Sequence, residues 1–202
     1  MEHSLNSITI RGILHDLPNF SHENHGRQFY RFLVEVPRLS GAVDLLPVVA
    51  QSQLLEDLQL CAGCSVAVTG QIRSHNLHID AVRRLMIFVF ASSVICEDGE
   101  AINDVILEGP LCKEPVFRRT PLGREICDAM LAVPRPFHRA DYLPCILWGR
   151  TAQEISQCHI RDKVRIYGRL QSHIYTKLTP EGATERTAYE ISALTAQILP
   201  SD

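Results

Sequence analysis

The sequence predicts an all-β protein with one short helix per unit, built as two tandem copies of a small five-stranded barrel. Three observations predict it: a repeat over most of the chain, strand-like segments in each copy, and a glycine inside the fourth segment of each copy. The 202 residues are enough for two small domains, and the 46% hydrophobic and 21% charged content excludes a disordered or collagen-like chain.

The repeat places the second copy 97 residues after the first, as Gly12 and Gly109 illustrate. The paired segments are Asn6…Gly12-Ile-Leu14…Pro18 with Asn103…Gly109-Pro-Leu111…Pro115, Gly26-Arg27 with Gly123-Arg124, Val36-Pro-Arg38 with Val133-Pro-Arg135, Asp44–Pro47 with Asp141–Pro144, Cys61 with Cys158 and, one inserted residue later, Val68–His75 with Ile166–His173. Chance matches do not hold one register over such a length. We therefore expect a first domain at residues 1–96, a linker at 97–102 and a second domain at 103–202.

Each copy contains five strand-like segments rich in Ile, Val and Leu. They are Ser7–Leu14, Phe29–Val36, Leu45–Ala50, Ser65–Ser74 and Leu85–Val94 in the first copy, and Asp104–Leu111, Ile126–Val133, Tyr142–Trp148, Lys163–Ser172 and Tyr189–Leu199 in the second. Gly70 and Gly168 interrupt the fourth strands, where a glycine usually marks a bulge or a sharp bend.

A short helical stretch separates the third and fourth strands of each copy. Thr151 and Glu154 have the spacing of a capping box, in which the two side chains bond first-turn amides, and Ile155 follows at helical spacing. In the first copy the stretch is 52–60, with a Ser cap and no reciprocal Glu. Five strands with a helix between the third and fourth is the order of the OB-fold, a Greek-key barrel.

Composition and charge exclude several classes of protein. With 20 Lys and Arg against 23 Asp and Glu, the net charge of −3 excludes a uniformly basic protein but leaves room for a local basic groove. The longest apolar stretch, Leu85 to Cys96, is too short for a membrane span, and the first residues lack the pattern of a signal peptide. Seven scattered cysteines favour a reducing cytoplasm.

The second copy resembles the bacterial single-stranded DNA-binding proteins over almost all of residues 103–199. The segments that carry the resemblance stand in the family's order and spacing: Asn103-Asp-Val-Ile-Leu-Glu-Gly-Pro-Leu111, Pro115, Arg118-Arg-Thr-Pro-Leu-Gly123, Leu131-Ala-Val133, Ile146-Leu-Trp-Gly-Arg150, Val164-Arg-Ile-Tyr-Gly-Arg-Leu170 and Tyr189-Glu-Ile191. The first copy is similar to the family only through its alignment to the second. Members with two OB domains in one chain are known, so the resemblance implies a tandem member of this kind.

The resemblance places the family's base-stacking aromatics on Phe137, Tyr142, Trp148 and Tyr175. Physical chemistry points the same way, because binding single strands without sequence choice needs aromatic faces for the bases and cations for the phosphates. The candidate phosphate-binding residues are Arg118, Arg119, Arg124, Arg135, Arg139, Arg150, Arg169 and Lys177. The alternative is that the aromatics are ordinary core or interface residues and the arginines a solvated face.

The first copy departs from this pattern. Its residues at the four aromatic positions are Ser40, Leu45, Gln51 and, approximately, Leu77. Residues 1–100 hold 7 Lys and Arg against 11 Asp and Glu, a net charge of −4, whereas residues 101–202 hold 13 against 12, a net charge of +1. We expect the first domain to be a scaffold or oligomerisation unit and the second to bind DNA.

The sequence contains one pattern with the residue types of a metal site and no catalytic motif. Cys61-Ala-Gly-Cys64 followed by His75-Asn-Leu-His78 has the residue types of a Cys2His2 zinc site. A strand over 65–74 would, however, separate Cys64 from His75 by roughly 30 Å at about 3.3 Å per residue. We expect no metal and two buried thiols at a helix-end turn. Without a nucleophile elbow or a glycine-rich phosphate loop, we expect no enzyme and no cofactor.

The predicted function is to coat single-stranded DNA in replication, recombination or repair, in the cytoplasm with the nucleoid. The resemblance implies a homodimer that presents four OB domains, and the uninterrupted apolar run Leu85–Ala91 is typical of a strand covered on both faces, by a partner or by the second domain. The chain stops at Leu199-Pro-Ser-Asp202, so recruitment of repair enzymes through the family's acidic tail is not expected. The alternative function is an OB-fold interaction module, a primosome-like accessory whose DNA binding is weak or lost.

Overall fold

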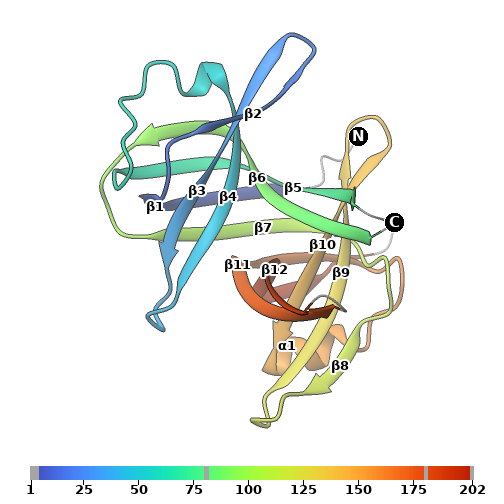
Figure 1. Cartoon of the computed structure of the whole chain (residues 1–202). Helices are drawn as coiled ribbons and strands as arrows, with labels where there is room; N and C mark the ends of the chain where they lie inside the picture. Colours follow the sequence, from blue (N-terminus) through green and yellow to red (C-terminus); the bar gives the residue numbers. More distant parts are fainter. Residues whose placement is uncertain (1–4, 80–81, 180–181, 201–202) are drawn as a thin grey trace.

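A computed structural model of the chain describes residues 5–79, 82–179 and 182–200, with side chains except at 78–79, 82–83 and 177–179. Two units with the same strand order follow one another (Figure 1). The first contains β1 (Asn6–Leu14), β2 (Asn19–Asn24), β3 (Arg27–Pro37), β4 (Val43–Gln51), the 3-10 turn η1 (Ser52–Leu54), β5 (Ser65–Ile79) and β6 (Val82–Cys96). The second contains β7 (Ile102–Pro110), β8 (Val116–Arg119), β9 (Glu125–Arg135), β10 (Arg139–Trp148), α1 (Gly149–Ile155), β11 (Lys163–Thr179) and β12 (Gly182–Ile198).

The strands of the first unit close into a ring. β1 pairs with β3, β3 with β4, β4 with β6, β6 with β5 and β5 with β1, and only the β4–β6 pair is parallel. The second unit repeats this ring with β7, β9, β10, β12 and β11, where a bridge between Leu111 and Leu131 joins the first strand region to β9. This is the strand order of the OB-fold, and the predicted fold class is confirmed.

The mid-strand glycines have the role that the sequence predicts. The ladder registers shift between Thr69 and Gly70 and between Tyr167 and Gly168, so each glycine lies at a bulge. A Cβ at Gly168 would come within 2.4 Å of the Ser192 carbonyl oxygen. Only glycine permits this close approach of two strands, which bends the long strand around the barrel.

Strand alternation builds the core of each barrel. Along β10, Leu143, Cys145 and Leu147 are buried, while the residues between them point outward. β4 repeats the pattern with Leu46 and Val48. Each of these side chains is removed from water, and burying a leucine contributes about 1.5–3 kcal/mol.

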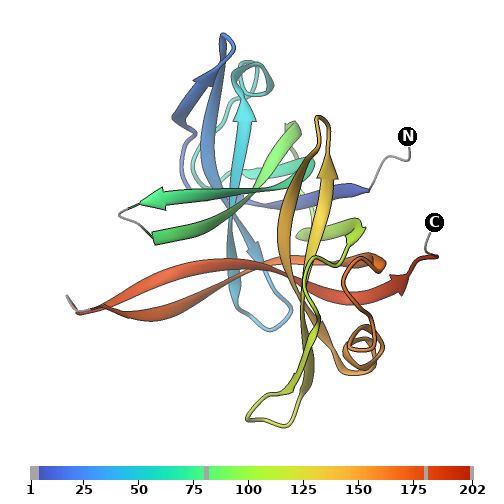
Figure 2. The ribbon, with the colours of Figure 1, turned by 90° about the vertical axis from the view of Figure 1, so that its right-hand side faces the viewer.

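Two kinds of contact join the units. β1 and β7 pair antiparallel from Asn6 opposite Leu107 to Arg11 opposite Ile102, which links all strands into one twelve-stranded sheet. The ends of β5–β6 and β11–β12 form two long hairpins that project on the same side of the molecule (Figure 2). Each hairpin contacts the barrel of the other unit, β5 against β10 and β11 against β4. The binding surface of one unit can therefore include residues of the other.

The helical expectations need two corrections. The stretch 52–60 holds only the 3-10 turn η1, because a regular helix would turn Leu60 away from the core that it contacts together with Leu54, Leu55 and Leu58. The predicted capping box is also wrong. The helix α1 begins at Gly149, directly after β10, so Thr151 lies inside it and Glu154 binds Arg150 instead.

Two short strands were not expected from the sequence. β2 and β8 pair with β3 and β9 as hairpins, and every residue of both is exposed. Such strands carry no apolar alternation because neither face is buried. Among the residues that the structure describes, no helix is long and apolar enough to cross a membrane.

Candidate nucleic-acid interface

One outer face of the second barrel gathers three of the four predicted aromatics. Because Leu143, Cys145 and Leu147 point inward, the alternate residues Tyr142 and Trp148 point outward from β10. The exposed fractions of the four aromatics are 91% for Phe137, 47% for Tyr142, 39% for Trp148 and 42% for Tyr175. All four thus offer ring surface to solvent and none is a core residue.

A hydrogen bond to the adjacent strand β12 holds Trp148. Its indole Nε1 donates to Ser192 Oγ on β12 at 3.1 Å. Arg169 on β11 stands directly opposite Ser192 in the ladder, and directly opposed residues share a face. The indole and the Arg169 guanidinium therefore belong to one surface formed by β10, β12 and β11.

The other two aromatics lie at the ends of this surface. Tyr175 stands on the projecting part of β11, with its ring centroid 6.2 Å from that of His173. Phe137 occupies the turn between β9 and β10 at a φ of +63°, an uncommon conformation for a residue with a side chain. This turn directs the phenyl ring into solvent rather than onto the barrel.

Most of the predicted phosphate-binding arginines sit at the surface, and several have acidic neighbours. Arg119 contacts Glu125 at 2.8 Å, Arg150 contacts Glu154 at 2.8 Å, and Arg118 forms a two-pronged pair with Asp128. Exposed pairs of this kind contribute little to stability, so a phosphate can displace the carboxylate. Three more, namely Arg124, Arg139 and Arg169, have no side-chain partner among the described residues.

Arg135 and Lys177 differ from the other predicted phosphate-binding residues. Arg135 donates to Asp141 through Nε at 2.6 Å and Nη2 at 2.8 Å, and Asp141 is completely buried. The guanidinium is thus committed to a link inside the protein, which sequence reasoning did not foresee. The side chain of Lys177 lies outside the described residues.

An acidic side chain lies within the same face. Glu190 on β12 is half-buried, and His173 Nδ1 lies 3.7 Å from its Oε2. Burial is the largest effect and raises the pKa of this carboxyl. His173 lowers the pKa, the negative charge of Asp128 raises it further, and Arg118 and Arg38 lower it less. An ionised Glu190 would oppose the approach of a phosphate chain.

The first unit holds an aromatic cluster that the sequence did not reveal. Gln51 replaces the tryptophan, but Phe29 stands opposite Gln51 on β3 and packs against Phe90 of β6 at 5.9 Å. The exposed ring of His22 stacks on Phe29 at 4.8 Å. Neighbouring strands thus bring rings near Gln51, where Phe29 is buried and the imidazole of His22 is the exposed ring.

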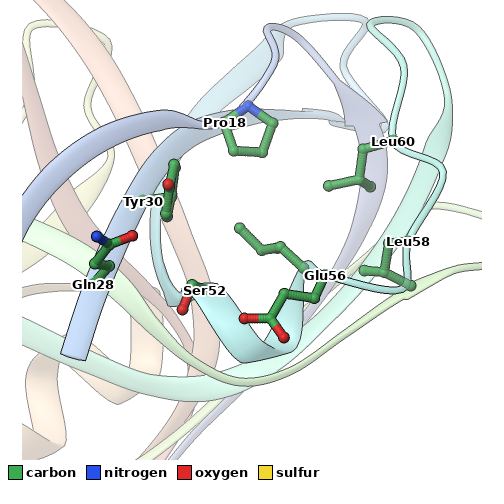
Figure 3. Close-up of a pocket in the computed structure, with 8 residues that line it drawn as sticks. Pro18, Gln28, Tyr30, Ser52, Glu56, Leu58 and Leu60 are labelled. Atoms are coloured by element: carbon green, nitrogen blue, oxygen red, sulfur yellow. The ribbon is translucent and has the colours of Figure 1, made fainter.

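A cavity on the first unit lies apart from this face. Its volume is about 420 Å³, and it opens between β3 and the segment after η1 (Figure 3). It is lined by Pro18, Gln28, Tyr30, Ser52, Leu55, Glu56, Leu58 and Leu60. The matching place in the second unit is lined by α1 residues and by Pro115 and Phe117.

The cysteines do not follow the sequence expectation. Cys61 is exposed and Cys64 half-buried, so the two thiols are not buried at a helix end. In the described part of the chain, no three side chains of His, Cys, Asp or Glu come close enough to hold a metal ion. The side chain of His78, one member of the zinc pattern, lies outside that part.

The family becomes clear from comparison with known proteins. Residues 102–199 match the model of the single-strand binding protein family. "Single-stranded DNA-binding protein B" of Bacillus subtilis is 36% identical over 80 residues, which are 36% of this chain and 71% of that protein. "Single-stranded DNA-binding protein 3" of Listeria innocua is 32% identical over 109 residues, 50% of this chain, and the chain spans only 65% of its length.

The whole chain has a structural counterpart. The crystal structure of the wild-type single-stranded DNA binding protein from Thermus aquaticus superposes with a TM-score of 0.80, over 99% of this chain and 95% of that one, at 22% identity. This likeness covers both units, whereas the family model covers only the second, and it concerns the fold alone. Together with the Bacillus relative, the match over 102–199 shows that the chain belongs to the single-strand binding protein family.

Proposed function

We propose that the chain binds single-stranded DNA with little sequence preference, mainly through the outer face of its second unit. The observation that carries the proposal is the exposure of Tyr142 and Trp148 on β10 and of Tyr175 on β11, the two strands that flank β12, with Phe137 at the turn before β10. Every base has a π-face, so stacking on such rings is tolerant of sequence and contributes about 1–3 kcal/mol per base. Surface arginines beside the rings provide the complementary charge for phosphates.

The functional names of the relatives support the proposal. The Bacillus, Listeria and Thermus proteins are named as single-stranded DNA-binding proteins. We infer that this chain coats exposed single strands in replication, recombination or repair, in the cytoplasm with the nucleoid, and that it catalyses no reaction. A protein that only docks other proteins would have no need for four exposed aromatic rings at the stacking positions. We therefore favour DNA binding over the interaction module.

Division of labour between the units is part of the proposal. Residues 103–202 act as the main binder, residues 1–96 as a scaffold, and residues 97–102 as the linker. Support comes from the four non-aromatic residues at the stacking positions and from the net charge of −4 in the first half. Through the cluster of His22, Phe29 and Phe90, the first unit would contribute less to DNA binding than the second.

We also propose that two chains form a homodimer with four OB domains. The outer side of β6 supports it, since Met86 and Phe88 are only half-buried within one chain. Light scattering on the full chain tests this assembly. We expect a mass near twice 22.7 kDa, and a mass near 22.7 kDa at micromolar concentration would overturn it.

The binding test uses the natural reporter Trp148, the one tryptophan of the chain. Oligo-dT of about 35 nucleotides, enough for two OB-folds of about 4–16 nucleotides each, should quench its fluorescence by stacking. Affinity should fall with salt by about 0.7 log units per phosphate contact for each tenfold increase. Equal affinity for the duplex of the same length at about 0.2 M salt would argue for the interaction module instead.

A further inference from the structure

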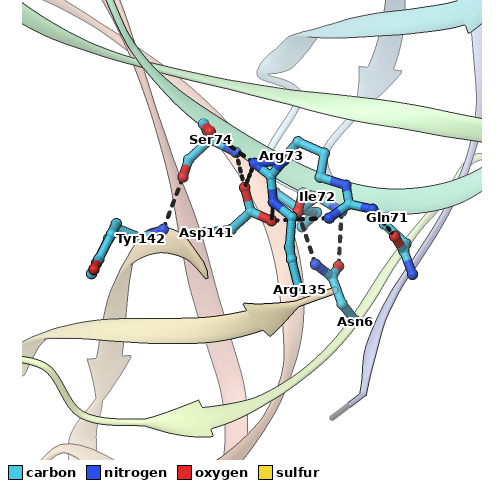
Figure 4. Close-up of polar contacts among 8 residues, drawn as sticks. All are labelled: Asn6, Gln71, Ile72, Arg73, Ser74, Arg135, Asp141 and Tyr142. Atoms are coloured by element: carbon cyan, nitrogen blue, oxygen red, sulfur yellow. Dashed lines mark hydrogen bonds and ion pairs between the residues drawn. The ribbon is translucent and has the colours of Figure 1, made fainter. Parts of the chain in front are cut away.

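The buried carboxylate of Asp141 is the centre of a polar cluster between the units (Figure 4). Arg135 of the same unit donates two hydrogen bonds to it. From β5 of the first unit, the backbone N–H of Ser74 donates to Oδ1 at 2.5 Å, and Arg73 Nη1 approaches Oδ2 at 3.4 Å. Residues 73 and 74 thus lie against the start of β10, next to Tyr142.

Ser74 holds the backbone of Tyr142 directly. The Tyr142 N–H donates to Ser74 Oγ at 2.8 Å, and the Ser74 carbonyl accepts from Arg135 Nη2 at 3.3 Å. Tyr142 is one of the proposed stacking residues, and the direction of its ring depends on the position of its backbone. A serine of the first unit therefore fixes a ring of the second unit.

The equivalent contact, between Asp44 of the first unit and Ser172 of the second, has no counterpart of Tyr142 or Arg73. Ser172 Oγ accepts from the Leu45 N–H at 3.3 Å and thereby holds a leucine in place of a tyrosine. Asp44 pairs there with Arg38 alone, and the residue that matches Arg73 in the repeat is Gln171. The two contacts have the same architecture but different side chains beside the outer face.

The cluster at Asp141 carries one positive charge in excess. Two guanidinium groups, Arg73 and Arg135, share one carboxylate. The Arg73 side chain is only 17% exposed and lies 5.9 Å above the Phe90 ring. Burial, then the neighbouring charge of Arg135, lowers the pKa of Arg73. A poorly hydrated cation without full compensation favours an anionic partner.

We propose that Arg73 and Ser74 of the first unit are part of the single-stranded DNA site of the second unit. Ser74 is a positioning residue that sets the Tyr142 ring, and Arg73 supplies positive charge for a backbone phosphate of the nucleotide stacked there. This inference rests on the proposed function and adds a composite site that neither unit contains alone. It also explains why an acidic first unit keeps an arginine at this position.

The positioning role is tested in the full-length chain with Ser74→Ala and its matched control Ser172→Ala. Each variant removes one hydroxyl that accepts a backbone hydrogen bond across the same kind of contact. The Ser172 hydroxyl also donates to Asp44 Oδ1 at 3.0 Å, so Ser172→Ala should lower the melting temperature at least as much as Ser74→Ala. Oligo-dT affinity should fall by a factor of about 3 to 10 in Ser74→Ala, the range expected for one lost hydrogen bond, and stay within about twofold in Ser172→Ala. Equal loss of affinity in both would overturn the positioning role.

The charge role is tested with Arg73→Gln, which installs the residue found at the matching position of the other contact. Arg135 continues to pair with Asp141, so the variant should fold. The salt slope of oligo-dT binding should become shallower by about 0.7, the value for one phosphate contact, whereas Arg31→Gln on the exposed side of β3 should leave it unchanged. An unchanged slope in Arg73→Gln would overturn the charge role. If the wild-type chain itself fails to bind oligo-dT, the proposed function fails and not only this inference.

Discussion

Asp44 and Asp141 occupy the same position in the two units, and each accepts a backbone hydrogen bond from a serine of the other unit. Ser172 N–H donates to Asp44 at 2.6 Å, and Ser74 N–H donates to Asp141 at 2.5 Å. Both carboxylates are buried. The units are therefore joined reciprocally, by two polar links in addition to the β1–β7 ladder, and a change in either unit acts on the other.

We predict that Asp44→Asn and Asp141→Asn each lower the free energy of unfolding by about 2–4 kcal/mol, because each leaves an arginine without its buried charge partner. The range stays below the largest known values because Arg38 and Arg135 keep 25% of their side chains exposed. Urea unfolding followed by circular dichroism measures the loss. The exposed Asp104 provides a control, and Asp104→Asn should change the stability little. Equal effects at all three positions would argue against the links.

The sequence predicted the barrels well because their determinants are local. Alternation along 142–148 and 45–50 identified the third strands, and the glycines at 70 and 168 identified the bulges. The helix expected in the first unit does not form. Its four leucines, Leu54, Leu55, Leu58 and Leu60, can all reach the core only if the chain leaves the helical path after η1. The first residue of α1 could not be predicted from the capping-box spacing either, because the end of β10 at Trp148 determines where the helix begins.

The links between the units could not be predicted from periodicity because they join residues far apart in the sequence. Asp44 and Ser172 are separated by 128 positions, and Asp141 and Ser74 by 67. The repeat nevertheless contained the signal, since Arg38, Asp44 and Ser74 all recur in the second copy. When two copies of a repeat have diverged, a polar residue that is still identical in both is a candidate for a buried contact of this kind.

For Trp148→Ala we predict a loss of oligo-dT affinity of about 1–3 kcal/mol, the value of one stacked base, with little change in melting temperature. The indole is 39% exposed, so its removal leaves no large cavity. Fluorescence anisotropy of labelled oligo-dT measures the affinity without the tryptophan. Phe117→Ala removes a similarly exposed ring on the α1 side and should leave affinity unchanged. A large loss of stability with unchanged affinity would make Trp148 a core residue.

For Gly168→Ala we predict destabilisation by about 1–3 kcal/mol, the usual cost of forcing extra atoms into a packed region. The new Cβ would lie 2.4 Å from the Ser192 carbonyl oxygen, so β12 must move, and with it the partner of the Trp148 indole. Gly70→Ala creates the same clash with Phe90 in the first unit. Both variants should unfold at lower urea concentration, but only Gly168→Ala should shift the emission of Trp148. An emission shift in both variants, or in neither, would contradict the claim that Gly168 acts on Trp148 locally through Ser192.

Glu190 should make the stability of the protein depend on pH. Because burial raises the pKa of this carboxyl above the ordinary value of 4.5, the folded chain holds the proton more tightly than the unfolded chain. The resulting stability is fully present below the unfolded pKa and is lost as pH rises through the folded pKa. Glu190→Gln keeps the neutral form at every pH, so it should stabilise the protein at pH 7 and lose that advantage near pH 4.

The same titration should appear in DNA binding. At neutral pH, Glu190→Gln should raise oligo-dT affinity by a factor of about 2 to 5, the size expected of one partly screened charge, and the gain should shrink on acidification. His173, Asp128, Arg118 and Arg38 surround this carboxyl, so the two proteins are compared at each pH in the same buffer and salt. Glu185→Gln, on the exposed end of the β11–β12 hairpin, is the control for a general change of charge. If both variants gain equally at pH 7, the effect belongs to net charge, and Glu190 does not lie beside the bound strand.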